Sequence, residues 1–530
     1  MDAVQLSIFA NRLSGICEEM GALLRRCAFS PNIKDRLDFS CAIFDADGEL
    51  CAQAAHIPVH LGSMAYAMRD LVAGRDWQPG ALLVVNDPYL GGTHLPDVTV
   101  VAPVFGQGER PLAFAVTRAH HANIGATAPG SMPVSRHLEE EGEVIAPQWL
   151  RRDGAWQQWL VQRLTGSTVE PERSPRFGDF VAQASACDAG AGWLATLVGE
   201  RGEDWFQEGV AALNTYGERL AGQMIAAIPD GRYRFADVLD DDGQGTLDIP
   251  VVVTVTIAGA GAQVDFTGTA PQVPGNINCP LSVAAAAVYY CFRCLLPAAV
   301  PACAGLFRPI SLSAPEGSLV NARRPAAVAA GNVETSSRIV DAVLGALSQA
   351  IPARIPAASQ GSMNNLAMGQ QAGAGQPGWD YYETMGGGMG GSLQAPGLSA
   401  VQTHMTNTLN TPIESLERHY PLRVWRYAVR RGSGGAGAHP GGDGLVRELE
   451  FLAPAQVTLL TERRRHAPWG LAGGQPGAPG ENLLNGTPLP GKVSVQARPG
   501  DRLRVAPPAA AGLARLNSRW PTSMESCRHC

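Results

Sequence analysis

Asn86-Asp-Pro-Tyr-Leu-Gly-Gly-Thr-His-Leu-Pro-Asp97 separates two apolar runs, residues 81–85 and 98–105. Both runs are short and rich in apolar side chains, which is typical of buried strands. The polar residues between them therefore lie on a connection between strands, where functional groups are often found. The segment predicts a functional site at the ends of neighbouring strands in a sheet.

The side chains of this segment include metal-ligand types. His94 and Asp97 are three residues apart, and His120 follows a further apolar run, residues 112–117. Imidazole and carboxylate groups that converge from a turn and a strand end can bind one divalent cation. The Asp-Pro and Gly-Gly pairs of the segment also form ordinary turns, beside which an Asp or His can simply bond to the local backbone. Spacing alone leaves both interpretations open, because mixed His/Asp sets are less specific than paired CxxC motifs.

A series of further segments resembles one family in the same order along the chain, up to about residue 505. These segments are Pro31-Asn-Ile-Lys-Asp-Arg-Leu-Asp-Phe-Ser40, His56-Ile-Pro-Val-His-Leu-Gly-Ser-Met64, Asn86 to Asp97, His120-His-Ala-Asn-Ile-Gly-Ala-Thr-Ala-Pro-Gly-Ser-Met132, Glu140-Glu-Gly142, Asp265-Phe-Thr-Gly-Thr269, Arg308-Pro-Ile310, Gly331-Asn-Val-Glu-Thr335, Gly361-Ser-Met-Asn-Asn365, Thr406-Asn-Thr-Leu-Asn-Thr-Pro412 and Ser433-Gly-Gly-Ala-Gly437. They resemble the hydantoinase B / 5-oxoprolinase family, which also contains the large subunits of acetone carboxylase and acetophenone carboxylase.

The resemblance implies an enzyme that acts on a small molecule with help from ATP, in which a separate actin-like, hydantoinase A-like subunit or domain binds ATP and performs the phosphorylation. The sequence itself contains no GxxxxGK[ST] phosphate loop and no GxGxxG that opens a helix after a strand. Gly386-Gly-Gly-Met-Gly-Gly391 is better interpreted as a flexible or close-packed loop than as a nucleotide cradle. We therefore expect ATP in the partner.

Carried over by position, the resemblance implies four metal ligands: Asp38, His94, Asp97 and His120. A set of two His and two carboxylates suits Zn or Mn. His121 and His60 are then the candidate acid–base or ligand-supporting groups, because imidazole titrates near neutral pH. For His60, a buried histidine bonded to backbone is an equal alternative.

The chain departs from the family pattern at three places. Asn123 stands where many members have Asp, so an acceptor or base at that position is weakened, and Cys303 replaces a usual Asn. Residues 506–530 form a divergent tail, which ends in an unpatterned segment with Cys527 and Cys530. Codons that spell residues 506–512 can also spell the family's Thr-Pro and glycine run in another frame. We therefore predict a frameshift near residue 505.

Composition excludes several classes of protein. The net charge is −7 without a basic block, which argues against nucleic acid as the main partner. No apolar stretch reaches the roughly 18 residues of a membrane-spanning helix. The eleven cysteines are scattered and follow no secretory segment, which predicts a reduced, cytoplasmic setting.

The chain of 530 residues is long enough for two or more domains, and its 61 Gly and 39 Pro indicate many turns and loops. Strand-like and helical patterns alternate with these turns, so we expect a mixed α and β (α+β), multi-domain fold. The first helix is marked by an apolar stripe over residues 6–23. We predict an N-terminal domain at residues 1–230 that holds the metal site, and one or more C-terminal domains at residues 231–505.

The resemblance favours ATP-dependent hydrolysis of a cyclic amide such as 5-oxoproline or a hydantoin. The first alternative is an ATP-dependent ketone carboxylase, which would depend on bicarbonate. The second is a non-catalytic assembly subunit that stabilises the ATPase. The altered tail and the changes at residues 123 and 303 favour this last possibility, and stoichiometric bound metal would argue against it.

Overall fold

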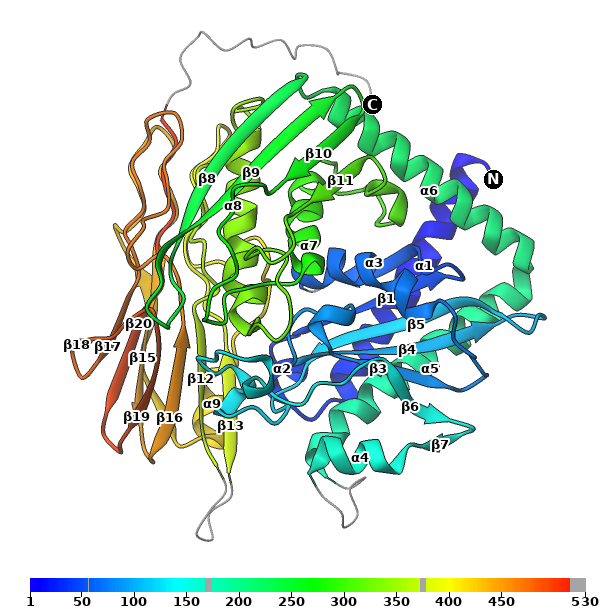
Figure 1. The fold of residues 1–530 in the computed structure, drawn as a ribbon, viewed down its shortest axis with the longest axis horizontal. Coiled ribbons are helices and arrows are strands. Elements are labelled where there is room, and N and C mark those ends of the chain that lie inside the picture. Colours follow the sequence, from blue (N-terminus) through cyan, green and yellow to red (C-terminus); the bar gives the residue numbers. More distant parts are fainter. Residues whose placement is uncertain (56, 167–173, 372–377, 515–530) are drawn as a thin grey trace.

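The computed structural model describes residues 1–55, 57–166, 174–371 and 378–514, and within them helices are combined with four β-sheets (Figure 1). This arrangement confirms the expected mixed α+β class with several sheets. His56 and the terminal segment with Cys527 and Cys530 lie outside the described residues.

The N-terminal part forms a seven-stranded sheet in the order β2-β1-β5-β4-β3-β6-β7, in which every neighbouring pair is antiparallel. Its strands are β1 (Phe39–Asp45), β2 (Leu50–Ala55), β3 (Leu82–Val85), β4 (Asp97–Phe105), β5 (Pro111–His120), β6 (Gln148–Arg152) and β7 (Ala155–Trp156). The strands predicted around the Asn86-to-Asp97 segment are thus β3 and β4. The register places Asp97 opposite His120, so two predicted ligands meet at one end of the sheet.

Helices pack on this sheet. They are α1 (Ala3–Cys27), α2 (Pro31–Lys34), α3 (Pro58–Val72), α4 (Gln158–Thr165), α5 (Pro175–Arg201) and α6 (Glu203–Ala226). The stripe predicted for the first helix is confirmed, since Phe9, Leu13, Ile16 and Met20 are buried, although Leu24 rather than Leu23 completes the buried face. α1 packs against α5 and β2, and α5 packs against β4 and β5.

A second sheet follows, in the order β11-β10-β9-β8. Its elements are β8 (Gly231–Asp241), β9 (Leu247–Ala258), β10 (Gly261–Asp265) and β11 (Ile310–Ser313), accompanied by α7 (Leu281–Arg293) and α8 (Ser336–Leu347). α8 packs on β8, β9 and α7, and α7 packs on α3, so these helices lie between this sheet and the N-terminal part (Figure 1). A wide helical turn, Gly331–Thr335, leads into α8 and reaches the predicted metal residues.

The C-terminal strands form two further sheets, drawn in yellow to red in Figure 1. One has the order β13-β12-β16-β19, with β12 (Asn365–Gln370), β13 (Trp379–Glu383), β16 (Ala455–Leu460) and β19 (Lys492–Ala497). The other has the order β14-β15-β20-β17-β18, with β14 (Leu422–Arg430), β15 (Gly444–Phe451), β17 (Glu481–Leu484), β18 (Thr487–Pro488) and β20 (Arg502–Ala506); α9 (Ile413–His419) precedes β14.

Glycine-rich segments pack closely against the start of the predicted tail. Ala510 donates its N–H to the Gly442 carbonyl and accepts from the Gly435 N–H. An added Cβ at Gly388 would lie 2.0 Å from the Gly442 oxygen and 2.4 Å from the Ala510 nitrogen, so only glycine fits there. The Gly386-to-Gly391 segment is therefore a close-packed loop, one of the two structures expected for it.

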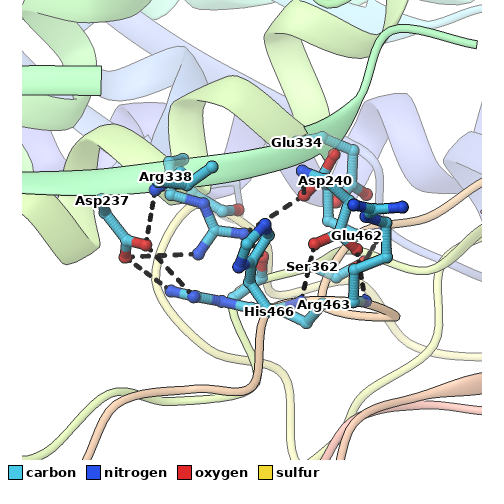
Figure 2. A network of polar contacts seen from close by, with 12 residues as sticks. Asp237, Asp240, Glu334, Arg338, Ser362, Glu462, Arg463 and His466 are labelled. Carbon is cyan, nitrogen blue, oxygen red and sulfur yellow. Dashed lines mark hydrogen bonds and ion pairs between the residues drawn. The ribbon is translucent and has the colours of Figure 1, made fainter. Parts of the chain in front are cut away.

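A buried network of charges joins the second sheet to the C-terminal part (Figure 2). Arg463 lies 2.7 Å from Asp237 on β8 and 2.6 Å from Asp341 on α8, and Arg338 contacts both carboxylates. Glu462 pairs with Arg338 and with Lys492 on β19. Removal of one member would leave an uncompensated buried charge, so the network fixes how these segments meet.

The seven-stranded sheet ends before residue 230, and the other three sheets begin after it. One apolar cluster nevertheless includes Phe9 of the N-terminal part and Leu306 of the later part. The domain boundary itself remains a prediction. Across the residues that the structure describes, no helix is both long enough and apolar enough to span a membrane.

Candidate metal centre

Strand pairing brings the four predicted ligands together. His120 ends β5 and pairs with Asp97 at the start of β4, while the turn before β4 carries His94. Asp38 immediately precedes β1, the other neighbour of β5, and the His120 N–H donates to its carbonyl at 3.0 Å. The site therefore lies where three adjacent strands end.

The donor atoms converge on one point. His94 Nε2 is 3.1 Å from Asp97 Oδ1, and His120 Nδ1 is 3.3 Å from the same oxygen. Asp38 Oδ2 is 4.0 Å from His120 Nδ1. All four residues are buried, and the donor atoms of the two histidines and Asp97 lie within 4.8 Å of one another.

Hydrogen bonds leave the converging atoms free for a cation. His94 donates from Nδ1 to the Ala329 carbonyl at 3.3 Å, so in its neutral form Nε2 carries a lone pair. Asp97 Oδ2 accepts from Thr93 at 2.6 Å and from Asn332 at 3.3 Å, whereas Oδ1 has no hydrogen-bond partner among the described residues. Supporting bonds of this kind orient metal ligands in proteins. The donor atoms of His94, Asp97 and His120 fit one divalent cation, and the Asp38 carboxylate lies beside them.

Burial and charge favour the metal-binding protonation states of Asp97 and His120, whereas at His94 the neighbouring Asp97 outweighs burial and raises the pKa. Burial alone would raise the pKa of Asp97, but the neighbouring His94 and His60 and the hydrogen bonds to it hold that pKa well below its usual range. Burial is also the main reason why the pKa of His120 is lowered. Asp97 is therefore a carboxylate and His120 a neutral imidazole near neutral pH.

The two remaining predicted residues occupy different places. His60 Nε2 donates to Asp97 Oδ2 at 3.3 Å, and its Nδ1 accepts from Ser40 at 3.2 Å, so it supports a ligand. His121 points elsewhere: its Nε2 bonds to Gln183 at 2.8 Å and its ring packs on Phe180. The structure brings His60 to the metal residues and places His121 beside a separate cleft of about 610 Å³.

Residues from later in the chain complete the site. Tyr382 on β13 stacks on His120, with ring centroids 4.7 Å apart, and Asn332 bonds Asp97 from the turn before α8. A cavity of about 20 Å³ lies between the ligands and a wall that includes Thr384 and Thr408. The sequence marked the segments of Asn332 and Thr408 as family motifs but assigned them no role, and it gave no signal for Tyr382.

The two substituted positions lie away from this cavity. Asn123 donates to Asp380 at 2.7 Å beside the separate cleft, and Cys303 contacts the Leu213 carbonyl at 3.6 Å. Neither residue lines the metal cavity, so both departures leave the donor set unchanged.

The fold and the convergent His/Asp donors define a mixed α+β protein with a candidate centre for one divalent cation. The chain belongs to the hydantoinase B/oxoprolinase family, whose family model matches residues 2–515. It is 38% identical over 540 residues to 5-oxoprolinase 1 of Arabidopsis thaliana, a match that covers 96% of this chain and 42% of that protein. The chain thus spans about two fifths of the length of this relative.

Two further proteins are similar over nearly their whole length. A putative D-/L-hydantoinase subunit of Pseudomonas sp. (strain NS671) is 31% identical, with 99% of this chain and 92% of that protein covered. The solved structure of an ATP-dependent caprolactamase from Pseudomonas jessenii matches with a TM-score of 0.88 at 27% identity, covering 97% of this chain and 91% of that chain.

Proposed function

We propose that this chain is the metal-holding, hydrolytic subunit of an enzyme that opens cyclic amides, such as 5-oxoproline or a hydantoin, at the expense of ATP. ATP would be bound by a hydantoinase A-like partner. The observation that carries the proposal is the convergence of His94 Nε2, His120 Nδ1 and Asp97 Oδ1 with Asp38 in a buried cavity. The names of the relatives, which include an oxoprolinase, a hydantoinase subunit and a caprolactamase, support the substrate class.

The chemistry requires activation because an amide carbonyl is a poor electrophile. Phosphorylation of its oxygen in the partner would supply a better leaving group, and this chain would then receive the activated ring. A Zn or Mn ion, when bound by the four ligands, would supply Lewis acidity and lower the pKa of water. Asp97 would be held in place by Thr93, Asn332 and His60 while this occurs.

The cavity supports a hydrolytic step. Its volume of about 20 Å³ exceeds the roughly 10–15 Å³ that one water needs. Ile57, Val59, Val333 and Met363 contribute apolar side chains to its lining. A ring is larger than this cavity, so it can enter only if part of the lining moves.

His60 acts in this proposal as a positioning residue, because its Nε2 hydrogen is committed to Asp97. The acid–base role predicted for His121 requires a proton path from the neighbouring cleft, and it stays a prediction. Replacement of His121 by Gln tests it: a lost limb in the pH profile of kcat would support the role, and an unchanged profile would refute it.

The test is substrate-dependent phosphate release by the chain co-purified with its ATP-binding partner. We expect release and ring-opened product with 5-oxoproline or a hydantoin, independent of bicarbonate. Turnover of a ketone that requires bicarbonate would instead establish the carboxylase alternative. An intact complex without bound metal and without turnover of any compound would favour the assembly role and refute the proposal.

A further inference from the structure

One wall of the metal cavity consists of three threonines, Thr384, Thr406 and Thr408, each at most 5% exposed. Thr384 follows β13, and the other two belong to the Thr406-to-Pro412 segment, which no step above uses. Arg36 lies behind them, fully buried, with its guanidinium 4.8 Å from the centre of the Tyr382 ring. The wall faces the metal ligands across the cavity.

The nitrogen donors in this wall determine how the threonine hydroxyls can be oriented. Arg36 can only donate, and its NH2 group donates to Thr384 Oγ1 at 3.3 Å and to Thr408 Oγ1 at 3.5 Å. Gln402 Nε2 donates a second bond to Thr384 Oγ1, at 3.5 Å. With two N–H donors directed at the Thr384 oxygen, we assign the hydrogen of its 2.6 Å bond with Thr408 Oγ1 to Thr384.

Thr408 is then left with an unused donor. Its oxygen accepts from Arg36 and from Thr384, which fills both lone pairs, and its O–H finds no acceptor in the described part of the chain. Thr406 also lines the cavity. A buried donor without an acceptor is costly, so the Thr408 hydroxyl favours an occupant with acceptor oxygens.

The charge behind the wall specifies which oxygens fit. The one carboxylate near the Arg36 guanidinium among the described residues is Asp38, at 3.8 Å, and the other partners of Arg36 are neutral. When Asp38 ligates a cation, the guanidinium has no counterion of its own. A buried positive charge of this kind is stabilised by an anion.

We infer that Thr408, backed by Arg36 and Thr384, binds an anionic oxygen of the substrate beside the metal. This inference rests on the proposed function and assigns substrate selection to the polar wall. The oxygen belongs either to a carboxylate on the ring, as in 5-oxoproline, or to the phosphoryl group added by the partner. Both are oxyanions that accept a hydrogen bond from a hydroxyl.

The test is calorimetric binding to the full chain loaded with Zn or Mn, with inorganic phosphate, 5-oxoproline and the neutral lactam 2-pyrrolidinone as probes. We expect Thr408→Val, which removes the hydroxyl and keeps the shape, to weaken oxyanion binding about tenfold. Thr408→Ser should restore it. Thr458→Val is the matched control, because it removes a buried hydroxyl on β16 outside the cavity wall.

The probes separate the two sources of the oxygen. A loss confined to 5-oxoproline identifies the ring carboxylate, and a loss confined to phosphate identifies the phosphoryl group. Equal affinities of the parent chain and Thr408→Val overturn the inference, as do an equal loss for 2-pyrrolidinone, a fall in metal content, or no binding of either oxyanion. Turnover is not part of this readout, so Thr408-dependent oxyanion binding would stand even if the complex hydrolysed no cyclic amide.

Discussion

Replacement of His94 by Ala should separate metal binding from folding. His94 lies on the turn before β4 and supplies Nε2 to the convergent site. The change removes one of the four candidate ligands and leaves the strand pairing of Asp97 and His120 untouched. We expect a folded chain that no longer retains the cation.

The magnitudes follow from the contacts. The imidazole makes one hydrogen bond, to the Ala329 carbonyl, and its loss with the truncation should cost about 1–3 kcal/mol of stability. That is less than the roughly 5–15 kcal/mol by which proteins are usually stable. Loss of a supporting residue lowers metal affinity by about 10–100-fold, so loss of a ligand should exceed about 100-fold.

The assay is metal content after dialysis, measured beside the thermal unfolding midpoint and phosphate release by the complex. His419→Ala is the control, because His419 lies exposed near the end of α9. Metal content, unfolding and turnover of that variant should equal those of the parent chain. Stoichiometric metal and normal turnover in His94→Ala would refute the ligand assignment.

Four further outcomes are expected. Thr93→Val removes the 2.6 Å bond to the metal-ligand carboxylate, and metal affinity measured by competition with a chelator should fall about 10–100-fold. Burial raises the pKa of Glu334 to about 7, so the folded chain holds this proton more tightly than the unfolded chain does. The protonated carboxyl therefore contributes its full stability below the pKa of the unfolded state, and this contribution is lost as the pH rises toward 7. The stability of Glu334→Gln minus that of the parent, followed by the unfolding midpoints, should therefore increase between about pH 4.5 and 7, by up to about 3 kcal/mol. A difference that stays constant with pH would contradict this. Lys492→Met removes one of the two buried cations that pair with Glu462 and should cost about 3–5 kcal/mol in denaturant unfolding, and a smaller loss would show that Arg338 and the rest of the network compensate. Resequencing the codons of residues 506–514 tests the frameshift, which requires that they spell the glycine run in another frame.

The local sequence predicted strands and a helix that position the site. Alternation of apolar runs with Gly and Pro turns predicted β3 and β4, and the spacing of apolar residues predicted α1. These signals are local because side-chain periodicity follows the geometry of one element. The ligand types on the Asn86-to-Asp97 turn were also visible, and the resemblance added Asp38 and the grouping with His120.

The tail illustrates how tertiary structure adds to such an interpretation. Residues 509–513 belong to the stretch that diverges from the family pattern, yet they are buried between glycine segments, and Ala510 bonds to Gly435 and Gly442 through the backbone. Backbone bonds and close approach depend little on the side chain, so alanine can occupy part of this layer. The frameshift and the domain boundaries remain predictions.

By itself, the sequence predicted the fold class, the family and four candidate metal ligands. Only the tertiary structure decided that His60 supports Asp97 while His121 faces another cleft. It also brought Tyr382 and Thr408, which follow His120 by more than 250 positions in the sequence, against the candidate ligands. The physical reason is that hydrogen-bond direction and burial around a site depend on which distant strands and turns pack together, and a linear pattern carries no record of that packing.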